Sequence, residues 1–155
     1  MLTRPHPRGL LHDMTQPGDM DRTLVEAAAS LRARLGGAAS TGIVLGSGLG
    51  AFADALDERT EIPFADIPGM PTAGVEGHAG RLVGGRSGVA RVPVLVLEGR
   101  AHLYEGHSPQ RVVYGVRLLA ALGVRTLLIT NAAGGVRAGL RPGDLMLIEA
   151  QLNLT

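Results

Sequence analysis

The segment Gly99–Ser108 brings together side chains that could bind an anion and a sugar. It contains an arginine, two histidines, a tyrosine and a glutamate, and it directly follows the apolar run Val92–Leu97. Arg100 can hold a phosphate-sized dianion through paired hydrogen bonds, His102 can add a hydrogen bond that depends on protonation, and Tyr104 offers a ring face that suits a sugar. In an α/β chain, such residues lie at the carboxyl end of a buried strand, where ligands usually bind, although this segment alone is equally typical of an ordinary polar loop.

Two glycine-rich turns offer a second kind of anion site. Gly46–Gly50 (GSGLG) follows a β-prone run, and Asn131–Gly135 (NAAGG) follows an apolar one. Backbone N–H groups in such turns can point at a phosphate, and the hydroxyl of Ser47 can add a donor. The first turn lacks the spacing of a dinucleotide fingerprint and the Gly-Lys-Ser/Thr ending of a nucleotide P-loop, so a plain strand-to-helix turn is the alternative.

His78 stands between glycines just before a predicted strand, where it could contact an anion or a sugar; a surface-turn histidine is the alternative. Three kinds of chemistry have little support. No close pair of carboxylates suggests glycoside hydrolysis. Acidic residues are too sparse near the glycine turns for an obvious magnesium site. The chain has no cysteine, which excludes a thiolate nucleophile and a cysteine-ligated zinc site. An anion site beside a sugar site, with neither metal nor thiol, points to attack by phosphate itself.

Composition predicts one globular domain. The 155 residues are 45% hydrophobic but only 3% aromatic, so the core must consist mainly of leucine, valine, alanine and isoleucine. The net charge is +1 and the basic residues are dispersed, which gives no sign of a nucleic-acid partner. The sequence has no apolar run long enough for a membrane span and no signal peptide, so we expect a cytoplasmic protein that does not bind membranes.

Glycines and prolines divide the chain into elements that must position these groups. We expect a disordered leader over residues 1–20 and a helix from Asp21 or Thr23 to Leu35. The predicted strands are Thr41–Leu45, Arg81–Gly85, Val89–Leu97, Val124–Thr130 and Leu145–Ile148. If they are neighbours in a largely parallel sheet, their carboxyl ends converge on one crevice.

The connections between these strands also carry signals. Three prolines predict an extended surface connection over Ile62–Pro71. Ser87-Gly88 predicts a hairpin turn, and Arg141–Asp144 another turn. Gln110–Leu122 is predicted as one helix, with Ser108 as its N-cap and Pro109 at its first position. Its expected apolar face consists of Val112, Val113, Val116, Leu119 and Ala120.

Five linked motifs resemble those of the trimeric class of purine nucleoside phosphorylases. They are LGSGLG (45–50), GHAGRL (77–82), GRAHLYEG (99–106), TNAAGG (130–135) and PGD (142–144), and the resemblance extends from about Gly42 to Asn153. The related methylthioadenosine phosphorylases share the fold but resemble the chain less at residues 47–50 and 102–106. The resemblance implies a three-layer α/β fold with a central mixed, mostly parallel sheet, and residues 21–155 would form the amino-terminal part of such a domain.

The resemblance also implies roles for individual residues. The phosphate-binding residues would be Ser47, His78, Arg100, His102 and Ala132, the last through its backbone N–H. His102 would be catalytic and Tyr104 would pack on the ribose. The implied reaction is reversible phosphorolysis of the N-glycosidic bond of purine (deoxy)ribonucleosides, which gives a free base and (deoxy)ribose 1-phosphate in purine salvage. Inorganic phosphate would be the co-substrate, with no cofactor or metal, and the full-length family implies a homotrimer.

Two departures from the family keep alternatives open. Family members continue well past Thr155, and the residues that hold the purine are expected in that missing part, so the sheet would have an exposed edge and uncovered apolar surface. The family often has DHIN where this chain has AQLN (150–153). The alternatives are a methylthioadenosine phosphorylase-like enzyme, a non-catalytic phosphate- or nucleoside-binding fragment, and a fragment that folds only with a partner chain. The base preference stays open.

Overall fold

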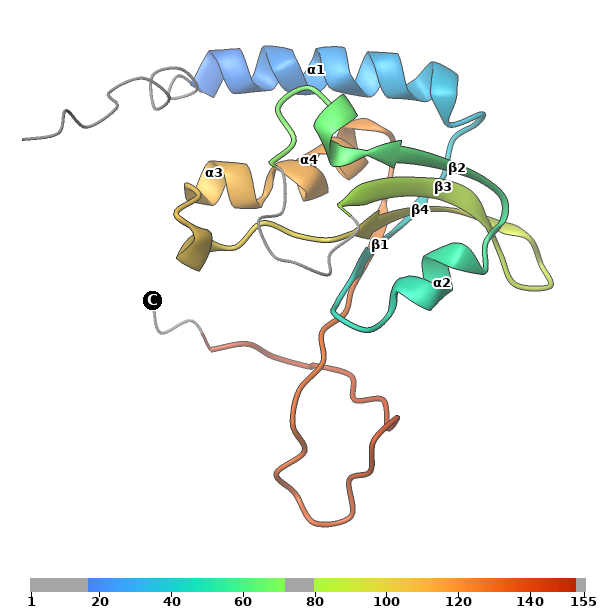
Figure 1. Cartoon of the computed structure of the whole chain (residues 1–155), viewed down its shortest axis with the longest axis vertical. Helices are drawn as coiled ribbons and strands as arrows, with labels where there is room; N and C mark the ends of the chain where they lie inside the picture. The colour runs from blue at the N-terminus through green and yellow to red at the C-terminus, as the bar shows by residue number, and fades with distance from the viewer. Residues whose placement is uncertain (1–16, 72–79, 153–155) are drawn as a thin grey trace, which may run out of the picture.

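The computed structural model describes residues 17–71 and 80–152, with side chains from residue 21 onward. It contains a five-stranded mixed sheet of order β2-β3-β4-β1-β5 (Figure 1). The strands are β1 (Thr41–Leu45), β2 (Asp57–Pro63), β3 (Arg81–Ser87), β4 (Val92–Glu98) and β5 (Thr126–Ile129). β1 pairs in parallel with β4 and β5, whereas β3 is antiparallel to both β2 and β4. The predicted α/β fold with a mixed sheet is confirmed.

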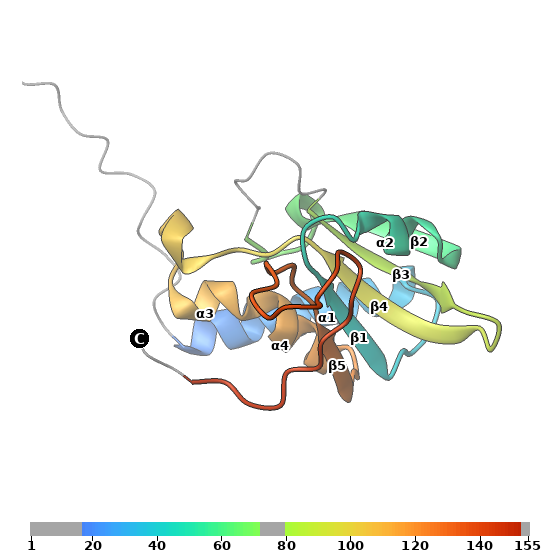
Figure 2. The same ribbon diagram turned by 90° about the horizontal axis from the view of Figure 1, so that it is seen from below.

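Helices lie on both faces of this sheet. They are α1 (Pro17–Arg34), α2 (Gly50–Asp54), α3 (Pro109–Val112) and α4 (Tyr114–Ala121), with short 3₁₀ turns η1 (Phe64–Asp66) and η2 (Leu103–Glu105). Figures 1 and 2 show α1 and α4 against one face and α2 against the other. Within the described ranges, no helix is both long and apolar enough to cross a membrane.

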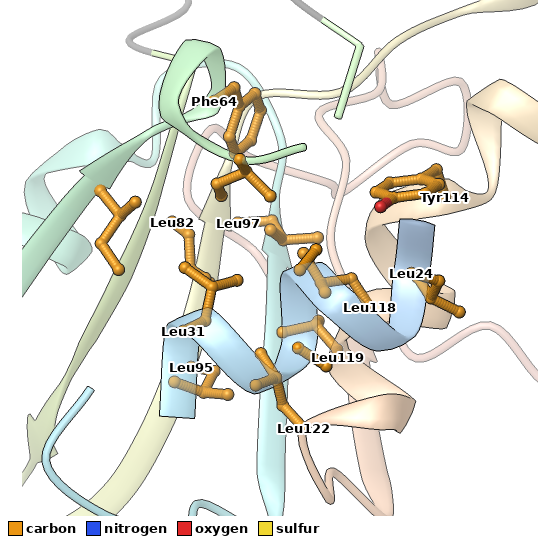
Figure 3. Packing of buried hydrophobic residues seen from close by; sticks show 14 of the residues in the cluster. Leu24, Leu31, Phe64, Leu82, Leu95, Leu97, Tyr114, Leu118, Leu119 and Leu122 are labelled. Atoms are coloured by element: carbon orange, nitrogen blue, oxygen red, sulfur yellow. The ribbon is translucent and has the colours of Figure 1, made fainter. Parts of the chain in front are cut away.

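Alternating strand residues fill two separate cores. In β4, Leu95 and Leu97 belong to the larger cluster under α1 and α4, whereas Val94 and Val96 belong to the smaller cluster beside α2. This two-residue period is the geometry of a strand covered on both faces. Figure 3 shows the larger cluster, in which Leu31 of α1 meets leucines of β3, β4 and α4. The sheet is therefore rigidly supported on both sides where β4 and β1 end.

The predicted helix Gln110–Leu122 is two helices, α3 and α4, separated at Val113. Ser108 caps α3 as predicted, because its side chain accepts a hydrogen bond from the Arg111 N–H at 3.4 Å, and Pro109 is the first helical residue. The predicted apolar face was partly right: Leu119 is buried and Val116 packs against the core, whereas Val113 and Ala120 are exposed. The residues of α4 that are buried are Tyr114, Gly115, Leu118 and Leu119. Packing of α4 on the sheet, rather than the spacing of the valines, determines which side chains of this longer helix are buried.

Two further predictions are corrected near the beginning of the chain. α1 begins at Pro17, so residues 17–20 belong to a helix and not to the leader. The segment Ile62–Pro71 is not a surface connection, because Ile62 lies in β2 and Phe64 and Ile67 are buried in the core. β2 is an edge strand of the sheet, and an edge strand tolerates the proline at its end. Pro63 thus marks the end of β2, and the prolines in this segment do not exclude a strand.

The carboxyl-terminal part is more exposed than predicted. β5 forms within the predicted strand Val124–Thr130, but its Leu128 and Ile129 side chains are exposed, and no described strand pairs with the outer edge of β5. Leu145–Ile148 is not a strand, and its side chains are exposed. The predicted turn Arg141–Asp144 is confirmed by a hydrogen bond from the Asp144 N–H to the Arg141 carbonyl at 3.1 Å. Figure 1 shows this part of the chain extending away from the sheet.

Candidate functional site

Three parallel strands end at one place, which we call the carboxyl edge: the ends of β4, β1 and β5. Leu45, the last residue of β1, is in register with Glu98, the last residue of β4, and Val44 is in register with Ile129 of β5. The segments that follow these strands therefore begin side by side. They are the ones that carry Ser47, Arg100 and Ala132.

The hydroxyl of Thr130 ties β5 to the first glycine turn. The Thr130 N–H and its hydroxyl both donate to the Val44 carbonyl, at 3.0 and 3.1 Å, and the Gly46 N–H donates to the Thr130 hydroxyl at 2.9 Å. Thr130 has no role among the predictions made from the sequence, although it opens the TNAAGG motif. A threonine directly after an apolar strand and before a glycine turn was the available signal.

Gly46 permits this close approach. A Cβ at position 46 would lie 2.8 Å from the Cα of Asn131 and 2.9 Å from the carbonyl oxygen of Thr130, and both of these atoms belong to the backbone. Any other residue would push the two turns apart. Ser47, the next residue, is exposed at the carboxyl edge, so its hydroxyl is accessible to a ligand.

Arg100 extends from β4 toward β5. Its Nη1 donates to the Thr130 carbonyl at 3.1 Å, and the side chain is half-buried. Its Nε is buried and makes no hydrogen bond to any described residue. Since a guanidinium has five N–H donors in a fixed plane, one anchored in this way keeps donors for an anion at the carboxyl edge.

His102 and Tyr104 form a stacked pair in the loop that contains η2. Their ring centroids are 4.8 Å apart and their planes differ by 12°. His102 is half-buried, whereas Tyr104 is 78% exposed. Nearby, His107 Nε2 lies 3.6 Å from Glu105 Oε2, an ion pair that exists only when His107 is protonated. The exposed face of Tyr104 leaves it available to a sugar.

Two of the predicted site residues are less closely tied to the others. Ala132 is exposed in the segment that follows β5. His78 lies outside the described residues, and the described chain resumes at Gly80, whose Cα lies 3.4 Å from the position of a Cβ on Gly99.

Among the described residues, no group of three or more His, Asp or Glu side chains is placed to hold a metal ion.

Arg81 and Glu98 form an ion pair at the carboxyl edge that the sequence analysis did not identify. Arg81 Nε donates to Glu98 Oε2 at 2.6 Å, and its two Nη atoms donate to Glu61 at 2.6 Å and Asp54 at 2.8 Å. These hydrogen bonds, that of Glu98 foremost, raise the pKa of Arg81 above its ordinary value. The predicted hairpin around Ser87-Gly88 was the available signal, because it places Arg81 opposite Glu98.

Comparisons with known proteins show which family the chain belongs to. A family model described as the phosphorylase superfamily matches residues 40–155. Purine nucleoside phosphorylase 1 of Geobacillus stearothermophilus is 46% identical over 135 residues, which are 86% of this chain and 48% of the relative. Purine nucleoside phosphorylase of Mycobacterium leprae is 47% identical over 114 residues, which are 73% of this chain and 42% of the relative. The chain thus spans about half the length of the curated relatives it matches.

Solved structures give the same result. Isoform 2 of purine nucleoside phosphorylase from Schistosoma mansoni, in complex with cytosine and ribose-1-phosphate, matches with a TM-score of 0.69 and 39% identity. The match covers 79% of this chain and 42% of that one. A Schistosoma mansoni purine nucleoside phosphorylase in complex with inosine matches with a TM-score of 0.68 and 34% identity. The chain belongs to the phosphorylase superfamily, and its relatives there are purine nucleoside phosphorylases.

Proposed function

We propose that this chain carries the phosphate and ribose part of a purine nucleoside phosphorylase site. The observation that supports this most directly is the position of Arg100. Its guanidinium is anchored to Thr130 between two glycine-rich turns, and its buried Nε makes no hydrogen bond to a described residue. A half-buried cation with donors to spare, beside turns rich in backbone N–H groups, is suited to a phosphate dianion.

The proposed roles follow the position of each group. Ser47, Arg100 and the backbone N–H of Ala132 bind phosphate from the segments that follow three adjacent strands. His102 binds phosphate from the loop after Arg100 and acts as the catalytic residue, and Tyr104, stacked on it, packs against the ribose. The resemblance to the family adds His78 as a further phosphate contact.

The proposed reaction is phosphorolysis of a purine (deoxy)ribonucleoside. A phosphate oxygen forms a bond to the anomeric carbon, the bond from that carbon to the purine nitrogen breaks, and the base leaves with the electron pair and takes up a proton. Positive charge develops on the sugar as the bond breaks. A phosphate dianion held by preorganised donors stabilises that charge and is already placed to react.

The complete enzyme extends beyond what this chain contains. The relatives are about twice as long, and we propose that the purine-binding residues belong to the part that this chain does not match. Residues 21–155 then form one portion of a phosphorylase domain. We also propose a cytoplasmic enzyme that assembles as a homotrimer and needs phosphate as co-substrate but no cofactor.

Release of hypoxanthine from inosine and phosphate tests the activity. The purified chain would be assayed alone and together with the part of the Geobacillus stearothermophilus enzyme that it does not match. We expect little activity alone and phosphate-dependent release with the added part. No hypoxanthine above background in either case, although the chain is folded by circular dichroism, would contradict the enzymatic proposal and favour a binding fragment.

Arg100→Ala tests the phosphate site itself. We expect phosphate binding to weaken by roughly 1.5–3 kcal/mol, the scale of hydrogen bonds to a charged group. NMR titration with inorganic phosphate would measure it through the amides of the two glycine turns. Arg86→Ala is the matched control, because Arg86 lies on β3 and pairs with Glu58 at the surface, 2.9 Å away. Equal phosphate affinity of wild type and Arg100→Ala would refute the role of Arg100.

A further inference from the structure

Glu98 and Arg81 lie beside the proposed phosphate site and have no part in the roles assigned above. We infer that the Arg81–Glu98 pair positions the Gly46–Gly50 turn, and through it Ser47, for phosphate. The inference depends on the proposed function for the identity of the ligand. The positioning itself rests on contacts within the chain and can be measured without phosphate.

Glu98 contacts two segments at once. It is the last residue of β4, directly before Gly99 and Arg100, and its side chain is only 16% exposed. One carboxylate oxygen, Oε2, accepts the hydrogen bond from Arg81 Nε at 2.6 Å. The other, Oε1, lies so close to Gly50 that a Cβ there would collide with it. One oxygen of the carboxylate is therefore hydrogen-bonded to Arg81, and the other packs against the residue where the glycine turn ends and α2 begins.

Arg81 holds the opposite end of the same helix. Its Nη2 donates at 2.8 Å to Asp54, the last residue of α2, and its Nη1 donates at 2.6 Å to Glu61 of β2. Arg59 also pairs with Glu61, at 2.8 Å. Contacts at both ends of this short helix, the approach of Glu98 Oε1 to Gly50 and the hydrogen bond from Arg81 to Asp54, thus connect it to β4 and β3. Since the turn leads directly into the helix, the same contacts restrain the turn.

The net charge of the cluster distinguishes a positioning role of Glu98 from a direct electrostatic effect on phosphate. The members of the cluster are Asp54, Arg59, Glu61, Arg81 and Glu98. It contains one more carboxylate than guanidinium groups, so its direct effect on a nearby phosphate is repulsive. If Glu98 acted on phosphate only through its charge, Glu98→Gln would strengthen phosphate binding. If Glu98 positions the turn, the same substitution weakens binding, because a neutral amide holds Arg81 less firmly. The two explanations therefore predict opposite changes in the phosphate affinity of Glu98→Gln.

The experiment compares Glu98→Gln and Arg81→Ala with Arg86→Ala in the full chain. Arg86 lies on β3 like Arg81 and also pairs with a carboxylate, but at the other end of the strand, opposite Pro93. Amide hydrogen exchange of Gly46 and Leu49, whose N–H groups donate to the Thr130 hydroxyl and the Gly46 carbonyl, is measured first, without phosphate, and a titration with inorganic phosphate follows. We expect about tenfold faster exchange in this turn and about tenfold weaker phosphate binding in the first two variants, the loss of one charge-assisted hydrogen bond. Arg86→Ala should change neither.

Two measurements separate positioning from a general loss of structure. Exchange at core amides such as Val83 and Val96 should match wild type in Glu98→Gln, which keeps the side-chain shape. Arg81→Lys keeps the charge but not the three-way contact, so it should restore part of the phosphate affinity that Arg81→Ala loses.

Two results would overturn the inference: turn exchange in Glu98→Gln and Arg81→Ala that equals that of Arg86→Ala, or tighter phosphate binding by Glu98→Gln. If the turn loosens in these variants while wild type shows no phosphate binding, the positioning is supported and the proposed function fails. The exchange measurement thus decides the positioning, and the wild-type titration decides the ligand.

Discussion

The strands β4 and β5 flank the same central strand, β1, and have opposite environments. Val94, Leu95, Val96 and Leu97 of β4 are all at most 4% exposed, covered by α1 and α4 on one face and α2 on the other. In β5, Leu128 is 51% and Ile129 is 64% exposed. Both segments are apolar and β-prone, so their sequence pattern does not separate them. What differs is the packing: among the described residues, helices cover both faces of β4, whereas Leu128 and Ile129 of β5 have no such cover.

This difference divides the candidate site. Ser47 and Arg100 follow strands of the packed part, whereas Ala132 follows the exposed strand, and the apolar residues 145–148 beyond it are exposed too. Exposed apolar surface of this extent is typical of an interface that another segment covers. The relatives have about twice the length of this chain, so they contain segments that could cover it. The proposed phosphate site is thus shared between a packed part and an exposed part of the chain.

Leu118→Ala compared with Leu147→Ala gives the largest expected contrast between the two parts. Leu118 is fully buried in the larger core, so its truncation should lower the free energy of unfolding by about 2–5 kcal/mol. Leu147 is 90% exposed, and its truncation should change stability by no more than about 0.5 kcal/mol. Urea unfolding followed by far-UV circular dichroism measures both. A large loss for Leu147→Ala would show that the 145–148 segment is packed.

Gly46→Ala tests the contact that joins the two parts. The added methyl group would meet the backbone of Thr130 and Asn131, so we expect a loss of about 1–3 kcal/mol and amide shifts on both sides of the contact. Gly134→Ala is the matched control, because no atom lies within 4 Å of the position of its Cβ. Equal stabilities for the two variants would mean that β5 moves away freely and is not held by the first turn.

The two tyrosines give the smallest contrast. The Tyr114 hydroxyl donates to the Pro68 carbonyl at 2.6 Å inside the core, so Tyr114→Phe should cost about 0.5–1.5 kcal/mol at neutral pH. Tyr104→Phe, which alters an exposed ring, should cost nothing measurable in the same unfolding experiment. Equal effects of the two substitutions would contradict the burial of Tyr114.

The same pair predicts a dependence on alkaline pH. Burial raises the pKa of Tyr114 above its ordinary value of 10.0, and the charge of Arg117 offsets this only in part. Tyr114 therefore keeps its proton up to a higher pH in the folded state than in the unfolded state. The contribution of Tyr114 to stability is therefore complete below pH 10 and is lost as the pH rises through the folded pKa. Wild type should lose stability more steeply in this range than Tyr114→Phe, and parallel pH profiles would refute the shift.

The local signals that succeeded depend on neighbouring residues alone. β1 has the bounds predicted from its glycines and β-branched residues, and Ser108 with Pro109 marked the beginning of α3. The signals that failed depend on long-range packing. The prolines led us to expect a surface connection where Ile62 is buried, and the apolar run 145–148 was predicted as a strand that does not form. The candidate side chains of the site could be read from the sequence. The contact of the Thr130 hydroxyl could not, because it depends on β5 lying beside β1, and the Arg81–Glu98 pair depends on the register of the β3–β4 hairpin.

The strand order also implies an order of folding. The hydrogen bond between Arg81 and Glu98 closes a hairpin between residues 17 positions apart in the sequence, whereas that between Thr130 and Val44 joins residues 86 positions apart. Short loops close faster and at a smaller entropic cost than long ones. We expect the β3–β4 hairpin to form early and β5 to dock late, during or after synthesis of the rest of the chain. Until β5 docks, the free edge of β1 is open to pairing with other chains, and the anchor of Arg100 does not yet exist.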